Sequence, residues 1–162
     1  MVAAKHRKLL DPGSHAPEFR LPRLDGGTAA LQEIVANGPA VIAFFKTTCP
    51  VCQLTFPFLE RIHKAGTLPV YAISQDDAED SRQFNRELGL TLPTLLDTGR
   101  SGYPASNAFG ISSVPTMFLL ERDGGISRVI EGWSKREIEW LGGRAGVEVF
   151  RQGDNVPEWK PG

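Results

Sequence analysis

Apolar and polar residues follow two rhythms along this chain, and each rhythm predicts a different kind of element. Residues 16–24 alternate between the two classes, residues 25–27 (Asp-Gly-Gly) are typical of a turn, and residues 28–31 supply a returning strand. We therefore expect an N-terminal hairpin. Residues 40–45 are nearly all apolar, which is typical of a central strand that is covered on both faces.

Helical spacing of apolar residues follows that central strand. Val51, Leu54, Phe58 and Ile62 recur at intervals of three or four residues, which predicts a helix with this face buried. Pro57 lies inside the predicted helix and should kink it.

The rest of the chain continues to alternate strands with helices, as in an α/β sandwich. Residues 70–74 and 94–96 are predicted strands, and between them Asp76 and Asp77 can cap a helix that Gly89 ends. The later predicted elements are a short helix at 103–109, an antiparallel hairpin of 116–121 with 126–131, and a last helix that Ser134 caps and that contains Ile138 and Leu141.

Length and composition indicate one ordinary domain. A chain of 162 residues is long enough to bury most of its apolar surface around one core. We expect an ordered domain over residues 13–150, a flexible N-terminus at residues 1–12, and a C-terminal tail over residues 151–162 that is mobile from Gly153 onward.

Charge does not identify a partner, since a net charge of −1 provides no basic field for nucleic acid. The basic residues at positions 5–8 are followed by only two leucines before Asp11, which is too short for a secretory signal, and no stretch approaches the length of a membrane span. We expect a cytoplasmic protein without nucleic-acid or membrane partners, or a periplasmic or secreted one if an upstream signal was removed.

The candidate chemistry lies at Cys49-Pro50-Val51-Cys52, between the predicted central strand and the predicted helix. Cysteines three apart at a helix start fall on one face and can close a small disulfide with little backbone movement. The helix dipole favours a thiolate there, so we expect the pKa of Cys49 to lie below the usual thiol value of about 8.5. We predict that Cys49 is the nucleophile and Cys52 its resolving partner.

Two other uses of a Cys-x-x-Cys pair have less support. The chain has 2 cysteines, whereas a structural zinc site needs four ligands, and His6, His15 and His63 show no matching spacing. Haem attachment is excluded because Gln53 follows the second cysteine. Spacing alone also allows a chance pairing of buried thiols, but the order of strand, motif and helix favours a redox dithiol without metal or cofactor. We expect His63 to lie on the surface.

Five segments stand in a characteristic order along the chain: Ala16-Pro17-Glu18-Phe19, Phe44 to Cys52, Pro57, Phe109 to Thr116, and Gly132. Together they resemble the thioredoxin superfamily, and within it the redoxin branch, which includes TlpA/ResA-type proteins and peroxiredoxins. The resemblance covers roughly residues 13–150. It implies an α/β fold of the thioredoxin type: a three-layer sandwich with a central mixed sheet flanked by helices and an N-terminal β-hairpin.

The resemblance also implies roles for individual residues. Cys49 matches the exposed attacking cysteine, Cys52 matches the buried one, and Pro115 matches the loop proline that is cis in this fold. A cis bond would place the Val114 backbone beside the disulfide, where it can pair with an extended substrate strand. Pro115 is also compatible with simply starting a strand. The expected substrate-binding residues are Val114, Pro115, Pro50 and Val51.

Three positions depart from the family pattern. Thioredoxins place a buried acid six residues before the first cysteine, where this chain has Ala43, and ResA-like proteins often carry a glutamate at the position of Thr55. Thr48 replaces the usual tryptophan before the first cysteine. Without a nearby carboxylate, the deprotonation of Cys52 needs water or a residue distant in sequence.

Two alternative functions remain open. A peroxiredoxin-like thiol peroxidase would use Cys52 as its peroxidatic cysteine, but the activating threonine, proline and arginine of that family are replaced by Cys49, Phe45 and Pro115. A thioredoxin-fold binding module with non-catalytic thiols would explain the missing acids, although such a module would not require both cysteines and the loop proline.

We therefore predict a monomeric thiol-disulfide oxidoreductase that exchanges disulfides with protein substrates. The Cys49–Cys52 pair would hold two electrons as a dithiol or release them as a disulfide, without a cofactor. Its expected partners are disulfide-bearing proteins and an upstream reductase or oxidant. The sequence leaves open the substrate, the direction of electron flow, the reduction potential and the regenerating partner.

Overall fold

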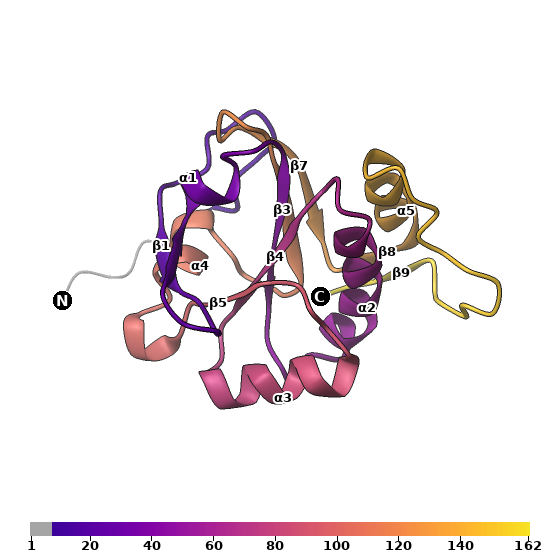
Figure 1. Ribbon diagram of the computed structural model, residues 1–162, viewed down its shortest axis with the longest axis horizontal. Coiled ribbons are helices and arrows are strands. Elements are labelled where there is room, and N and C mark those ends of the chain that lie inside the picture. Colours follow the sequence, from indigo (N-terminus) through magenta and orange to yellow (C-terminus); the bar gives the residue numbers. More distant parts are fainter. Residues whose placement is uncertain (1–7) are drawn as a thin grey trace.

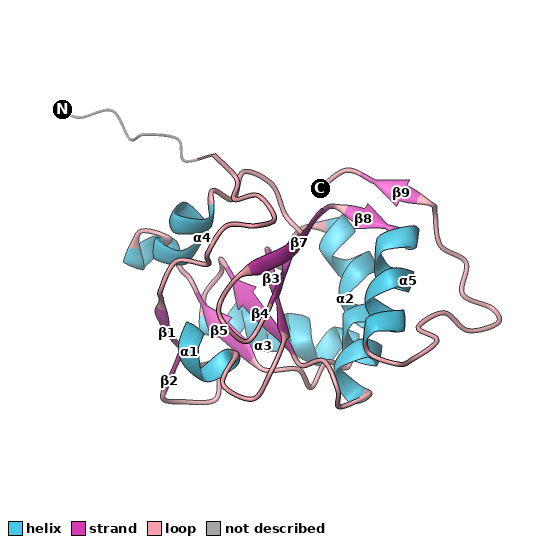
Figure 2. Cartoon of the chain, turned by 90° about the horizontal axis from the view of Figure 1, so that it is seen from above, coloured by secondary structure: helices cyan, strands magenta, loops and turns pink. Residues whose placement is uncertain are grey.

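The computed structural model describes residues 8–162 and arranges them in three layers around a central sheet (Figures 1 and 2). The flexible segment expected at residues 1–12 falls largely on residues 1–7, outside the described part. Residues 8–12 contact the domain, and the Leu10 amide donates to the Phe109 carbonyl at 3.2 Å. Within residues 8–162 no helix combines the length and the apolar character needed to cross a membrane.

The central sheet has five strands in the order β5-β4-β3-β6-β7. β3 pairs in parallel with β4 and antiparallel with β6, while β4 pairs in parallel with β5 and β6 antiparallel with β7, so the sheet is mixed as expected. The strands are β3 (Ala40–Phe45), β4 (Val70–Ser74), β5 (Thr94–Leu96), β6 (Thr116–Leu120) and β7 (Ile126–Glu131).

Helices cover both faces of this sheet, which completes the predicted α/β sandwich (Figure 1). One face carries α2 (Pro50–Lys64), α3 (Ala78–Leu88) and α5 (Lys135–Arg144). The other carries α1 (Leu31–Ile34), α4 (Pro104–Phe109) and the predicted N-terminal hairpin of β1 (Arg20–Pro22) with β2 (Thr28–Ala30). A 3-10 turn at Gly99–Ser101 and the short strands β8 (Trp133–Ser134) and β9 (Trp159–Lys160) complete the chain.

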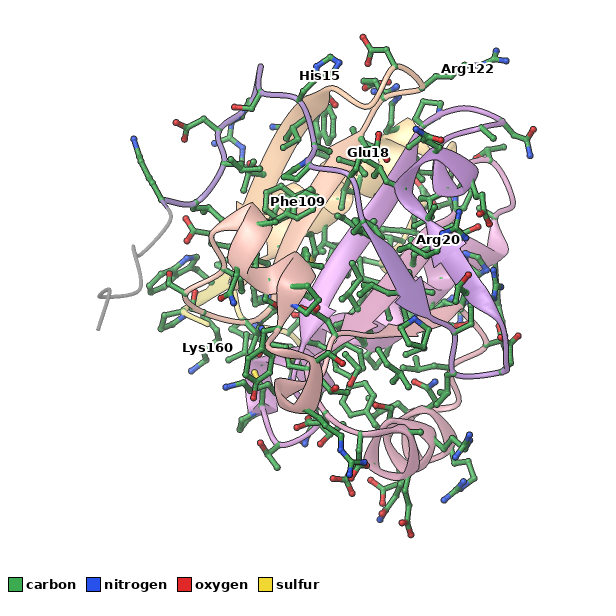
Figure 3. All side chains as sticks on the ribbon, turned by 90° about the vertical axis from the view of Figure 1, so that its left-hand side faces the viewer. His15, Glu18, Arg20, Phe109, Arg122 and Lys160 are labelled. Atoms are coloured by element: carbon green, nitrogen blue, oxygen red, sulfur yellow. The ribbon has the colours of Figure 1, made fainter. Side chains whose placement is uncertain are left out.

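Strand β3 separates two hydrophobic cores. All six of its residues are buried, and successive side chains point to opposite faces because the side-chain period of a strand is two. Val41, Ala43 and Phe45 face the core under α2 and α5. Phe44 faces the other core, where its ring lies 5.4 Å from that of Phe109 in α4. Figure 3 shows Phe109 on this side of the sheet.

The buried face of α2 differs from the predicted one. Phe58 and Ile62 are buried as expected, but Val51 and Leu54 are only half-buried. Apolar residues occur on more than one face of this helix, so the helical periodicity alone did not decide which face packs against the sheet. The residues that the helix buries are Cys52, Thr55, Phe56, Phe58, Leu59, Glu60 and Ile62.

The C-terminal segment is docked on the domain, which corrects the expectation of a tail that is mobile from Gly153. Arg61 of α2 makes two hydrogen bonds to the Asp154 carboxylate, at 2.6 and 3.2 Å. These bonds hold the pKa of Asp154 down at about 2. The buried Trp133 ring donates from Nε1 to the Pro157 carbonyl at 2.6 Å. Side-chain partners on the domain, which the tail's own composition does not reveal, therefore fix this segment.

Replacing Phe44 should test how far the fold depends on β3. We expect Phe44→Ala to lower the free energy of unfolding by about 3–5 kcal/mol, because the side chain is fully buried. Phe19→Ala is the control, since Phe19 also lies beside Phe109, at 6.1 Å, but is partly exposed. It should lower the free energy of unfolding by about 1–2 kcal/mol. Equal losses in urea unfolding would contradict this assignment of the core.

Candidate active site

The two cysteines lie where β3 hands over to α2. Cys49 has an extended backbone (φ −83°, ψ 114°) and is the N-cap residue of α2. Its sulfur accepts a hydrogen bond from the Cys52 amide at 3.2 Å, so the thiol group takes the place of the usual capping oxygen. Pro50 occupies the first turn, where a missing N–H costs nothing. The Cys49 sulfur is therefore fixed at the N-terminal end of the helix by the Cys52 amide.

The two thiols have different access to solvent. Cys49 is half-buried and Cys52 is completely buried. Only Cys49 can therefore meet a substrate without movement of the protein. The division into an attacking Cys49 and a resolving Cys52 stays a prediction, and this difference in access is compatible with it.

Burial also changes the acidity of the inner thiol. The pKa of Cys52 is raised far above its ordinary value, chiefly because burial disfavours the thiolate, and secondly because of the hydrogen bond with the Cys49 side chain. The negative charge of Asp76 adds a smaller contribution in the same direction. Cys52 thus stays protonated at neutral pH and has to lose a proton before it can act as a nucleophile.

The loop before β6 brings the predicted substrate residues to the thiols. The Val114–Pro115 bond is cis, as the resemblance implied. The Cys49 thiol donates to the Val114 carbonyl at 3.5 Å across a sequence separation of 65 residues. The Gly132 amide holds the loop from the other side by donating to the Pro115 carbonyl at 2.8 Å. Pro50 is exposed and Val51 half-buried at the helix start.

The positions that lack the family acids offer no carboxylate to Cys52. Ala43 is fully buried in β3. The Thr55 hydroxyl is also buried, and it donates to the Val51 carbonyl of its own helix at 2.7 Å. The structure therefore supplies no substitute proton acceptor at either position.

Asp76 contributes to this site in a way that the sequence analysis missed. Only Asp77 caps α3, by accepting from the Asp80 amide at 2.9 Å. Asp76 instead turns toward the loop before the cysteines, where its Oδ2 accepts from the Thr47 amide at 2.7 Å and from the Thr47 hydroxyl at 2.9 Å. One carboxylate oxygen thus anchors the loop that positions Cys49.

We predicted that His63 lies on the surface, and this prediction is wrong. It is half-buried, and its Nδ1 accepts from the Val70 amide at 3.0 Å, at the start of β4. Burial lowers the pKa of this imidazole. The neutral ring that this hydrogen bond requires is therefore favoured, and its role is structural.

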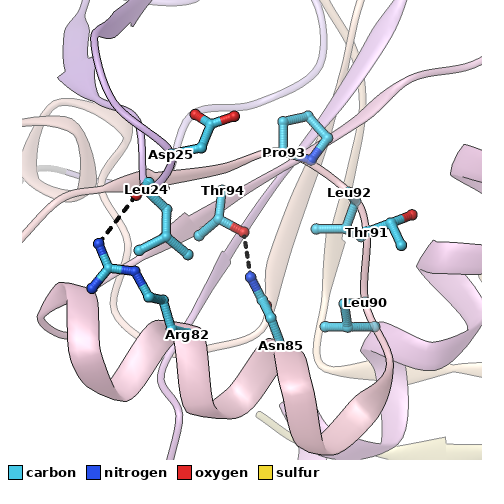
Figure 4. Close-up of a pocket in the computed structure, with 9 residues that line it drawn as sticks. All are labelled: Leu24, Asp25, Arg82, Asn85, Leu90, Thr91, Leu92, Pro93 and Thr94. Atoms are coloured by element: carbon cyan, nitrogen blue, oxygen red, sulfur yellow. Dashed lines mark hydrogen bonds between the residues drawn. The ribbon is translucent and has the colours of Figure 1, made fainter.

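One small hollow lies near the thiols. A cavity of about 120 Å³ lies beside Val114, between Lys46, Gln75 and residues 111–113. A larger one of about 310 Å³ lies between the hairpin loop at Leu24 and α3, and none of its lining residues belongs to the two loops at the thiols (Figure 4). Sites for small molecules are usually enclosed clefts of about 300–1,000 Å³. The surroundings of Cys49 suit contact with a larger partner better.

Comparison with known sequences identifies the family of the chain. Residues 12–129 match the sequence model described as AhpC/TSA family. Similar proteins include "Thiol-disulfide oxidoreductase ResA" of Geobacillus thermodenitrificans, 26% identical over 77% of this chain and 72% of that protein. The protein of the same name from Halalkalibacterium halodurans is 29% identical over 78% of this chain and 72% of its own.

Solved structures share the fold. A thiol:disulfide interchange protein from Bacteroides sp. superposes with a TM-score of 0.73 at 18% identity, covering 89% of this chain and 94% of that one. Peroxidoxin BcpB from Mycobacterium tuberculosis superposes with a TM-score of 0.67 at 20% identity, covering 84% and 94%. These likenesses show the thioredoxin-like fold. Since a protein named for thiol:disulfide interchange and a protein named as a peroxidoxin both have this fold, the fold by itself does not decide between thiol-disulfide exchange and peroxide reduction.

The raised pKa of Cys52 predicts a loss of stability at alkaline pH. Above about pH 8.5 the unfolded chain releases this proton while the folded chain keeps it, so the free energy of unfolding should fall by about 1.4 kcal/mol per pH unit. Urea unfolding of the reduced protein and of Cys52→Ser, from about pH 7 to pH 10, isolates this group. As the pH rises above about 8.5, the free energy of unfolding of the reduced protein should fall steadily relative to that of Cys52→Ser. If the difference between these two free energies does not change with pH, the prediction is contradicted.

Asp76 and Asp77 provide a matched pair of variants. Asp76→Ala should lower the free energy of unfolding by about 1–3 kcal/mol and change the rate at which iodoacetamide alkylates Cys49, because the Thr47 anchor is lost. Asp77→Ala should cost about 1 kcal/mol through the lost helix cap and leave that rate unchanged. If iodoacetamide alkylates Cys49 at the same rate in both variants, Asp76 does not position the loop.

Proposed function

Because the chain belongs to the AhpC/TSA family, we propose that it is a thiol-disulfide oxidoreductase that acts on protein disulfides through Cys49 and Cys52. The observation that carries the proposal is the unequal pair of thiols at the start of α2, one half-buried and one completely buried. The relatives named ResA support the same reaction class. The shallow surroundings of Cys49 favour a macromolecular substrate.

In the reducing direction the reaction has two displacement steps. The Cys49 thiolate attacks one sulfur of the substrate disulfide, forms a mixed disulfide, and expels the other substrate sulfur as a thiolate that takes up a proton. Cys52 then loses its proton and attacks the Cys49 sulfur, which releases the second substrate thiol. Two electrons pass to the substrate, and the protein is left with a Cys49–Cys52 disulfide that an upstream reductant has to reopen.

The second step should limit turnover. Cys52 is protonated at neutral pH, and neither Ala43 nor Thr55 provides a base. The proton has to pass to water, to the departing substrate thiolate, or to a residue distant in sequence such as Asp76, whose charge acts on Cys52. We therefore expect the mixed disulfide on Cys49 to accumulate during reduction.

The peroxidase alternative is weaker. In that mechanism Cys52 would meet the peroxide, yet its side chain is completely buried. Phe45 and Pro115, which stand where the family's activating proline and arginine would be, are also buried and carry no charge. A non-catalytic binding module does not explain why one thiol caps the helix within reach of the Val114 carbonyl.

Single cysteine variants test the assignment of roles. Cys49→Ala should abolish reduction of insulin disulfides, whereas Cys52→Ala should retain the first step and accumulate a mixed disulfide visible by mass spectrometry. Hydrogen peroxide consumption, measured on the same proteins, controls for peroxidase activity. Full reductase activity in Cys49→Ala would overturn the proposal, and peroxidase activity that depends on Cys52 alone would support the alternative.

The reduction potential of the Cys49–Cys52 pair would then show in which direction electrons flow between this protein and its substrate. A value near about −270 mV supports a reductant, and a value near about −120 mV supports an oxidant. If no Cys49–Cys52 disulfide forms in any thiol buffer, the oxidoreductase proposal fails and the binding module becomes the better account.

A further inference from the structure

Residues 159–162 return to the active site from the far end of the chain. β9 pairs antiparallel with β8, with Lys160 opposite Trp133 and Trp159 opposite Ser134. The Lys135 amide adds a hydrogen bond to the Glu158 carbonyl at 2.9 Å. The C-terminal end of the chain consequently lies beside β8 and the helix α2 in both views (Figures 1 and 2), and Lys160 lies at the edge of the molecule in Figure 3.

Two glycines allow this segment to lie directly on the backbone around the thiols. A β-carbon added to Gly132 would come within 2.5 Å of the Lys160 carbonyl oxygen and 2.9 Å of the Gly162 nitrogen. A β-carbon added to Gly162 would come within 2.6 Å of the Val114 carbonyl oxygen. Residues 159–162, here called the strap, therefore cover the edge of the loop that contains Val114.

That edge is the part of the site an extended polypeptide would use. The Val114 carbonyl accepts from the Cys49 thiol at 3.5 Å, and within residues 8–162 the Val114 amide makes no backbone hydrogen bond. An extended backbone segment beside a thiol can pair with an incoming strand, here through an amide that makes no backbone hydrogen bond within residues 8–162. Gly162 occupies the space that such a strand needs next to the carbonyl.

The strap is held weakly at the point where it covers Val114. Pro161 has no amide proton, and within the described residues no hydrogen bond joins residues 161–162 to Val114 or Gly132. Trp159 is 63% exposed, so little apolar surface would be lost if the strap lifted. Segments with few buried contacts and few hydrogen bonds open at low free-energy cost.

We infer that the strap is a displaceable specificity element, which lets small disulfides reach Cys49 while in place and has to lift before a disulfide within an extended polypeptide can bind along Val114. This inference rests on the disulfide exchange proposed above. A competitor tethered to the site lowers the apparent affinity of any ligand that needs the uncovered state, and it leaves other ligands unaffected.

Ending the chain after Glu158 tests the strap while keeping the bonds made by Asp154 and Pro157. Relative to the full chain, kcat/KM for insulin disulfides should rise about fivefold or more, and that for dithiobis(nitrobenzoate) should stay within about twofold. Trp159→Ala is the control, because it keeps the backbone of the strap and should change neither rate. Unchanged rates in the shortened chain, or an equal rise for both disulfides, would overturn the inference.

A second measurement does not depend on turnover or on the stability of the shortened chain. Cys52→Ala is coupled at Cys49, through an activated disulfide, either to a short extended peptide with one cysteine or to 2-mercaptoethanol. The nuclear magnetic resonance signals of Trp159 and Lys160 should move to unpaired positions in the peptide adduct only. An unmoved strap in the peptide adduct overturns the inference. If the strap moves in the peptide adduct but the full chain reduces no disulfide, the inference about the strap stands and the proposed function is rejected.

Discussion

The burial of β3 on both faces is the constraint on which the rest of the structure depends. Its side chains alternate between two cores, so a slip of one residue would exchange both sets and expose each to the wrong neighbours. The register with β4 and β6 therefore fixes where the strand ends, at Phe45. The loop to Cys49 begins there, and hydrophobic packing thus decides where the reactive thiol lies.

The contrast between the two thiols follows from the same packing. Cys49 stands outside the first turn of α2 and keeps access to solvent, whereas Cys52 faces the core one turn later. Burial makes the inner thiol hard to ionise and protects it from reagents in solution. The outer thiol is surrounded by polar backbone: the Cys52 amide on one side and the Val114 carbonyl on the other. One short motif thereby yields two thiols with different access to solvent, as the proposed attacking and resolving roles require.

Local signals predicted most of the elements. The hairpin at residues 20–30, the caps at Asp77 and Ser134 and the helix end at Gly89 depend on neighbouring residues, and they appear as expected. Two of the errors concern partners far along the chain. Asp76 meets the loop before the cysteines, and the C-terminal segment meets α2. His63 instead meets the Val70 amide seven residues later, at the start of β4. Hydrophobic periodicity reports neither kind of contact.

The sequence by itself determined the order of strands and helices and the place of the dithiol between the central strand and α2. These features depend on periodicity, capping and spacing, which act over a few residues. Only the tertiary structure decided which face of α2 is buried and which acid anchors the loop before the cysteines. It also decided that residues 159–162 lie over Val114. Such contacts join segments that are distant in sequence, and they exist only once the sheet has brought those segments together.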